Sequence, residues 1–124
     1  MGDFHQLKAW QHAKALAIEC ARAAARFPSE ERFALGDHLR RAAYGAALNV
    51  AEGASRRGTR EYRRYLDTAR ASLAEVEAIV EIAAELGYLQ PTSRARLEAR
   101  RDEAAKTVFG LLRAVAAKAD RTPR

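Results

Sequence analysis

Small apolar residues recur every three or four positions along most of this 124-residue chain, and alanine is the commonest of them. The sequence holds 29 alanines but only seven glycines and three prolines. Alanine has the highest helix propensity, and the scarcity of β-branched and aromatic residues argues against a sheet. We therefore predict an all-α protein, whose length suits a single domain over residues 1–124.

Proline and glycine divide this pattern into four helical segments joined by short turns. The segments are predicted at about residues 4–26, 29–54, 59–86 and 93–118. Pro28 ends the first segment, because proline disfavours helical geometry in the residue before it. Gly87 ends the third segment as the first residue past the helix. Because such short turns make consecutive helices antiparallel, the predicted fold is an up-down-up-down four-helix bundle.

The apolar stripe of the third segment is the most regular of the four. It comprises Tyr62, Leu66, Ala69, Leu73, Val76, Val80 and Ala83. A seven-residue repeat of this kind is typical of helices that pack with a left-handed crossing. In the second segment, Gly36 and Gly45 each cost about 1 kcal/mol relative to alanine. We expect them to lie where a neighbouring helix or Trp10 comes close.

The chain is basic, with a net charge of +6, and arginine outnumbers lysine by 18 to four. Guanidinium groups suit phosphate, so this composition favours anionic partners. The single cysteine, Cys20, permits no internal disulfide and indicates a reducing compartment. We expect it to be a small buried hydrophobe rather than a reactive thiol. No apolar run approaches the ~20 residues of a membrane span, so we expect a cytoplasmic protein with no membrane partner.

The strongest functional feature is an arginine-rich turn between the second and third segments. It carries Arg56, Arg57, Arg60, Arg63 and Arg64. Guanidinium groups pair with phosphates, and the interleaved Tyr62 and Tyr65 are of a type that stacks on unpaired bases. We therefore predict RNA or DNA binding at this turn. Arg40 and Arg41 would extend the same surface.

A plainer alternative stays open for this turn. Tyr62 also belongs to the apolar stripe of the third segment, which would place it in the core. The arginines would then be solvated, or paired with Glu52.

Asn49 and Glu52 are predicted to brace the end of the second helix. They lie three residues apart and are therefore neighbours on the helix surface. We expect Glu52 to lie opposite Arg60 or Arg63, and Asn49 to face one of the two tyrosines. The favoured role is a buried hydrogen-bonded network that sets helix register. A catalytic role is the alternative, and it lacks a partner acid, base or metal.

Recognisable catalytic and metal-binding patterns are absent from the sequence. It contains no Glu-x-x-His pair, no Cys-x-x-Cys and no glycine-rich phosphate loop. We predict a protein that is not an enzyme and that holds no metal or other cofactor.

Charge is divided between the surfaces of the last two helices. The third segment carries an acidic stripe and the fourth begins with a basic one: Glu77, Glu81 and Glu85, then Arg94, Arg96, Arg100 and Arg101. Stripes of opposite sign on different helices suit a head-to-tail contact between copies, which closes into a ring. Pairing of these side chains between adjacent helices of one chain is an alternative that the sequence favours equally.

Several short motifs at fixed separations resemble a known family. The sharpest are Leu39-Arg40-Arg41-Ala42-Ala43, Asn49-Val50-Ala51-Glu52-Gly53 and Ser72-Leu73-Ala74-Glu75. With these residues the chain resembles the four-helix-bundle proteins of the 23S ribosomal RNA intervening-sequence type. The accessory protein of diversity-generating retroelements is a relative of that family.

The resemblance implies a barrel-shaped homopentamer without known enzymatic activity. It also implies affinity for nucleic acid, for which we favour RNA, and it makes a reverse transcriptase a candidate partner. The alternative function is a protein–protein interaction scaffold that binds no nucleic acid.

Overall fold

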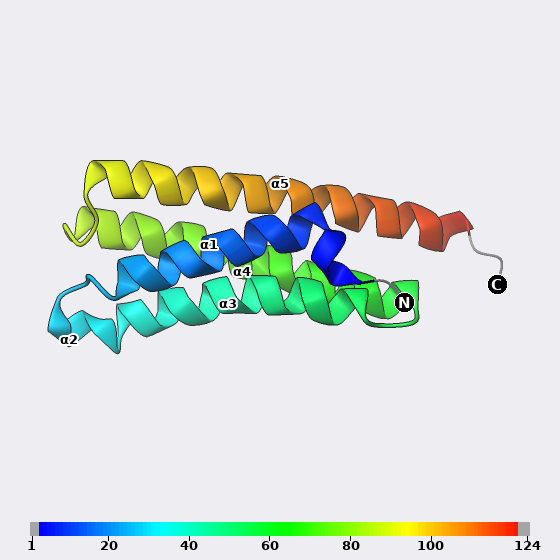
Figure 1. Ribbon diagram of the computed structural model, residues 1–124, viewed down its shortest axis with the longest axis horizontal. Coiled ribbons are helices and arrows are strands. Elements are labelled where there is room, and N and C mark those ends of the chain that lie inside the picture. Colours follow the sequence, from blue (N-terminus) through cyan, green and yellow to red (C-terminus); the bar gives the residue numbers. More distant parts are fainter. Residues whose placement is uncertain (1–2, 122–124) are drawn as a thin grey trace.

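The computed structural model describes residues 3–121 of the chain (Figure 1). A short 3-10 turn, η1 (Phe4–Gln6), is followed by α1 (Lys8–Ala24), α2 (Ser29–Arg32), α3 (Leu35–Ala54), α4 (Thr59–Glu85) and α5 (Pro91–Arg121). The four long helices pack against one another, and the described part of the chain contains no strand. The all-α prediction is confirmed.

The four long helices form a ring in which each contacts its two neighbours. α1 packs against α3 and α5, and α4 packs against the same two helices from the other side. Figure 1 shows the chain reversing direction at each turn. Contacts between α3 and α4 show the same reversal of direction. Gly45 lies beside Ser72, whereas Gly53, which comes later in α3, lies beside Tyr65, which comes earlier in α4.

Alanine, leucine and valine side chains fill the space between the helices. The stripe predicted for α4 is buried from Leu66 to Ala83, and Tyr62 at its start is half-buried. Leu16 of α1, which the sequence pattern omits, is fully buried as well. Among the residues whose burial is described, no polar or charged residue is buried. Apolar burial is therefore the main force that holds the bundle together.

The prediction of one continuous helix over residues 29–54 is wrong, because the helix is interrupted between α2 and α3. Ala34 has φ −115° and ψ −96°, which lies outside the helical region. The Arg32 carbonyl instead accepts a hydrogen bond at 2.5 Å from the side chain of Arg40, which also pairs with Asp37. Local helix propensity does not reveal this exchange of a backbone donor for a side-chain donor.

The end of α4 agrees with the prediction from sequence, whereas the start of α5 differs from it. Gly87 has φ +82° and its amide donates to the Ala84 carbonyl, while the Tyr88 amide donates to Ala83 at 2.8 Å. This pattern ends a helix with glycine in the left-handed region. α5 begins earlier than predicted, at Pro91, because the first helical position needs no amide donor.

Gly53 lies where α4 approaches α3 most closely. A Cβ atom built at Gly53 would come within 2.9 Å of the Tyr65 Cβ and 3.1 Å of the Tyr62 Cδ1. Both atoms are close to the α4 backbone and cannot easily move aside. The helix therefore needs glycine at this position for packing rather than for its backbone angles.

The two other glycines of α3 also lie against neighbouring elements. A Cβ atom at Gly45 would be 3.3 Å from the Ser72 hydroxyl, and one at Gly36 would be 3.6 Å from the Ala24 Cβ at the end of α1. The expected close approach to another helix is confirmed at both positions. Trp10 is not among the nearest neighbours of either glycine.

We predict that Gly53→Ala destabilises the protein by about 1–2 kcal/mol, because overpacking against α4 outweighs the gain in helix propensity. Gly110→Ala is the matched control. A Cβ atom at Gly110 meets no atom within 4 Å, so this change should stabilise α5 by about 0.5–1 kcal/mol. Urea unfolding of both variants measures the two effects, and equal midpoints would contradict the close contact at Gly53.

Candidate nucleic-acid interface

The turn formed by residues 55–58 places the arginine cluster at one end of the bundle (Figure 1). The Ser55 hydroxyl donates to the Glu52 carbonyl at 2.8 Å, and the Arg56 amide donates to the Gly53 carbonyl at 3.0 Å. Gly58 then adopts an extended backbone and starts α4. Because the connection is so short, the first turns of α4 lie beside the last turn of α3.

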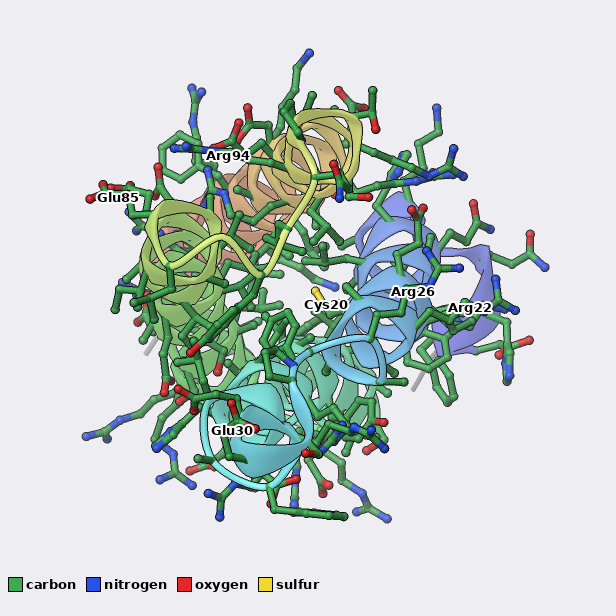
Figure 2. All side chains as sticks on the ribbon, turned by 90° about the vertical axis from the view of Figure 1, so that its left-hand side faces the viewer. Cys20, Arg22, Arg26, Glu30, Glu85 and Arg94 are labelled. Atoms are coloured by element: carbon green, nitrogen blue, oxygen red, sulfur yellow. The ribbon has the colours of Figure 1, made fainter. Side chains whose placement is uncertain are left out.

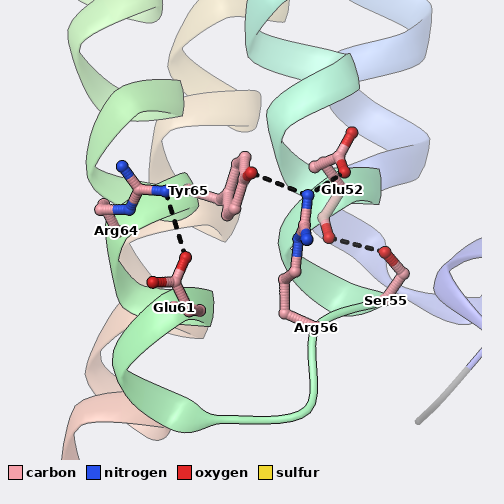
Figure 3. A network of polar contacts seen from close by, with 6 residues as sticks. All are labelled: Glu52, Ser55, Arg56, Glu61, Arg64 and Tyr65. Atoms are coloured by element: carbon pink, nitrogen blue, oxygen red, sulfur yellow. Dashed lines mark hydrogen bonds and ion pairs between the residues drawn. The ribbon is translucent and has the colours of Figure 1, made fainter.

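Arg56 is held against the bundle by two partners (Figure 3). Its Nη2 donates to Oε2 of Glu52 at 2.5 Å and to the hydroxyl of Tyr65 at 2.8 Å. The guanidinium carbons of Arg56 and Arg64 lie 4.9 Å and 5.4 Å from the centre of the Tyr65 ring. Arg64 also pairs with Glu61 at 3.1 Å. Two arginines of the turn are therefore oriented by carboxylates and by one shared tyrosine.

The other three arginines of the turn, Arg57, Arg60 and Arg63, are exposed and make no hydrogen bond or ion pair with any described residue. Arg60 and Arg63 border a shallow groove along the outer face of α4. Glu52 and Glu61 each pair with one of the five arginines, and the carboxylate of Asp67 also lines the groove, so the turn keeps a smaller excess of positive charge. Unpaired guanidinium groups on an exposed surface suit phosphate oxygens.

Arg40 and Arg41 do not lie at this turn. Arg40 is half-buried and pairs with Asp37 near the start of α3. Roughly 24 Å of helix separates it from Arg56, at 1.5 Å per residue. The predicted extension of the basic surface to these two arginines therefore does not agree with their positions.

The predicted surroundings of Glu52 are wrong. Its side chain is 49% exposed rather than buried, and it pairs with Arg56 of the turn instead of Arg60 or Arg63. An i,i+4 pair along one chain needs no help from α4, which explains why Arg56 is the preferred partner.

The predicted surroundings of Asn49 are wrong as well. Its side-chain amide donates to the carbonyl of Gly45 on the same helix at 2.7 Å, and it makes no bond to a tyrosine. Tyr62 and Tyr65 pack over Gly53 instead, so α4 meets α3 through carbon atoms at this level. Asn49 is half-buried beside that contact.

The two tyrosines of the turn have different surroundings. Tyr62 packs against the core, and its burial raises the pKa of the phenol. The alternative placed Tyr62 in the core, and the structure places it half-buried against the core. Tyr65 lies half-buried at the surface with two guanidinium groups against its ring. Of the two, Tyr65 is therefore the tyrosine within reach of a ligand at the arginines.

The arginines at the start of α5 are paired within the chain. The Nε atoms of Arg96 and Arg100 donate to the two carboxylate oxygens of Glu19 on α1, each at 2.5 Å. Arg101 lies 3.8 Å from Glu77 of α4. Among the described residues, Arg101 with Glu77 is the one ion pair that joins the two charged stripes, because Arg96 and Arg100 pair with Glu19, outside the acidic stripe.

Glu19 joins α1 to α5 by pairing with two arginines, and the sequence pattern did not single it out. Burial opposes its ionisation, but the hydrogen bonds and charges of Arg96 and Arg100 outweigh burial and hold the pKa of this carboxyl below its usual range. The available signal was a single carboxylate between Ile18 and Cys20 in an apolar stretch of α1. Its partners lie about 80 residues further along the chain, so only the fold identifies them.

Cys20 lies inside the bundle between the long helices (Figure 2). Its burial, with a smaller contribution from the charge of Glu19, raises the pKa of the thiol to about 12. Since the thiolate is the reactive form, this cysteine is inert at neutral pH. The predicted role of a small buried hydrophobe is confirmed.

Within residues 3–121, no group of three or more histidine, cysteine, aspartate or glutamate side chains is placed to hold a metal ion. None of the helices in that range has both the length and the hydropathy of a membrane span.

Residues 5–110 match the profile of a protein family described as 23S rRNA-intervening sequence protein. The chain belongs to this family. The match covers more than four fifths of the sequence and includes the arginine-rich turn, Glu19 and the greater part of the core. No curated protein matches the chain. The family thus accounts for the bundle and is consistent with a role connected to nucleic acid.

We predict that Cys20 resists thiol reagents at about pH 8 while the protein is folded, because burial keeps it protonated. In concentrated guanidinium chloride it should react at the rate of a free thiol. Absorbance of the thiol–disulfide exchange product measures both rates. Rapid reaction of the native protein would contradict the buried position.

Proposed function

We propose that this protein is a non-catalytic, homo-oligomeric bundle that binds nucleic acid, RNA in preference to DNA, through its arginine-rich turn. One observation carries the proposal: Arg57, Arg60 and Arg63 are exposed at the turn with no partner among the described residues. The family's description, 23S rRNA-intervening sequence protein, supports a role connected to nucleic acid.

The turn offers an RNA strand two kinds of contact. Free guanidinium groups on Arg57, Arg60 and Arg63 would pair with phosphates and provide most of the affinity. Tyr65, oriented by its arginine neighbours, offers a partly exposed ring edge to an unpaired base. Arg56 and Arg64 already have carboxylate partners, so their main role in the proposal is to position that ring.

We predict that replacing Arg57, Arg60 and Arg63 together by glutamine weakens binding of single-stranded RNA. It should also reduce the slope of log affinity against log salt by about 2, since each phosphate contact contributes about 0.7 to that slope. Fluorescence anisotropy at several salt concentrations measures both quantities.

The matched control removes the same charge elsewhere. Arg32, Arg41 and Lys106 are exposed and have no side-chain partner among the described residues, and glutamine at these three positions should leave the slope nearly unchanged. If both triple variants behave alike, net charge rather than the turn drives binding, and the proposed interface is wrong.

An apolar groove on the outside of α1 and α3 supports self-association. It is lined by Trp10, Ala17, Ile18, Ala21, Tyr44, Ala47 and Leu48 and bordered by two basic residues, Lys14 and Arg22. Leu48, one of the lining residues, is 62% exposed. An exposed apolar surface of this kind is typical of an interaction site.

α4 carries a surface of complementary character. Ile82 and Leu86 are exposed on it, with Glu81 and Glu85 beside them. Figure 2 shows Glu85 and Arg22 projecting on opposite sides of the bundle. A ridge and a groove on different sides suit a head-to-tail contact between copies, which closes into a ring. The pentamer implied by the family resemblance is the assembly we propose.

We predict that Leu48→Glu in the groove and Ile82→Glu on the ridge each convert the assembly to monomers, as measured by light scattering. Each variant keeps one intact surface. An equimolar mixture should therefore form dimers and nothing larger. Phe33→Ser, which removes the most exposed aromatic side chain, is the control and should leave the mass unchanged. Larger assemblies in the mixture would contradict the head-to-tail contact.

The same groove favours a second candidate function, an interaction scaffold that binds no nucleic acid. A reverse transcriptase is its candidate client, as the resemblance to retroelement accessory proteins implies. In that case the two triple variants would bind RNA equally weakly, and the Leu48→Glu variant would lose the protein partner. For either function we propose a cytoplasmic location, supported by the single cysteine.

A further inference from the structure

A second cationic region lies at the end of the bundle opposite the arginine-rich turn. It is a cleft of about 590 Å³ between α1, α5 and the turn that joins α4 to α5. This volume falls within the usual range for small-molecule sites, ~300–1,000 Å³. The apolar part of its lining comes from Ile18, Ala23, Leu89 and Leu97.

Glu19 organises the cationic side of the cleft. Its side chain is only 15% exposed, and both of its oxygens accept hydrogen bonds from the Nε atoms of Arg96 and Arg100. The Nη groups of these two arginines have no partner among the described residues. One carboxylate therefore holds two guanidinium groups side by side while leaving their outer donors available.

The cleft has more positive charge than one carboxylate can balance. Arg22 of α1 and Arg26, two residues past its end, also line it, and neither has a partner in the described part of the chain. Figure 2 shows both side chains on the outer side of α1. With Arg96 and Arg100 they make four guanidinium groups against the single Glu19. Like charges that line one cleft repel one another, so an anion bound between them would be stabilised.

The remaining polar groups of the cleft favour an anion rich in acceptors. Ser93 and Gln90 supply further donors, whereas the hydroxyl of Tyr88 is already bonded to Glu31 at 2.9 Å. Arginine forks match the oxygens of a phosphate group. The apolar part of the lining suits an organic group attached to that phosphate.

We propose that this cleft binds a phosphomonoester dianion, held by Arg96, Arg100 and Arg26, with its organic group against Ile18 and Leu97. Such a dianion occurs on a small molecule, such as a nucleoside monophosphate, and at the 5′ end of a nucleic-acid strand. The site does not depend on the arginine-rich turn.

Calorimetric titration of the full-length protein tests the site with adenosine 5′-monophosphate, adenosine and a pair of RNA oligonucleotides that differ only in a 5′ phosphate. We expect the monophosphate to bind and adenosine not to bind. A preference only for the 5′-phosphorylated oligonucleotide would identify the strand end as the source. Affinity should fall as the pH drops through about 6, where the dianion takes up a proton.

The variant Arg96→Lys with Arg100→Lys keeps the charge of the cleft and its pairing with Glu19 but removes the arginine forks. We expect it to weaken monophosphate binding about tenfold or more, the effect of losing one or two charge-assisted hydrogen bonds. Circular dichroism confirms that the variant is folded. Arg26→Gln, at an exposed position without a partner, provides a second test and should weaken binding as well.

Three results would overturn the proposal: no binding of either phosphate ligand at millimolar concentration, equal binding of adenosine, or unchanged affinity in both variants. The triple glutamine variant of Arg57, Arg60 and Arg63 separates this site from the proposed function. It should lose RNA affinity at the turn and retain monophosphate binding in the cleft. Loss of both activities in that variant would contradict two independent sites.

Discussion

The close packing of α3 against α4 is the contact on which the rest of the structure depends. Gly45 and Gly53 bring the two helices together, and Tyr62 and Tyr65 pack over the second of these glycines. With no Cβ atom at Gly53, the first turns of α4 lie directly beside the last turn of α3. The short turn between them can then close, and the arginines of α4 join Arg56 at the end of the bundle.

The arginines of the bundle fall into two groups that differ in burial and in pairing. Arg96 and Arg100 of α5 are paired across helices with Glu19, whose carboxylate is mostly buried. Those of the turn are exposed and only partly neutralised by neighbours in the chain. Burial strengthens the first kind of pair, and solvent weakens the second. The same residue type is therefore held in place by a carboxylate on α5, whereas three arginines of the turn have no such partner among the described residues.

The helices and their buried faces could be predicted because they depend on residues close together in the chain. The stripe from Leu66 to Ala83 and the end of α4 at Gly87 both follow from local spacing and backbone preference. The break at Ala34 could not be predicted in this way, since it depends on Arg40 reaching back to the Arg32 carbonyl. A helix pattern contains no information about such a contact.

The arginine-rich turn was visible in the sequence, because its residues are neighbours in the chain and their charge does not depend on the fold. The partners of Asn49 and Glu52 were not visible there, and both side chains bond within their own segment rather than across to α4. Glu19 is the opposite case, since its two arginines come from a helix about 80 residues away. Periodicity along the chain thus decided that this protein is a helical bundle with a basic turn. The packing of helices decided which arginines are paired and which remain free, because a charge acts through space on whatever the fold brings within a few ångströms.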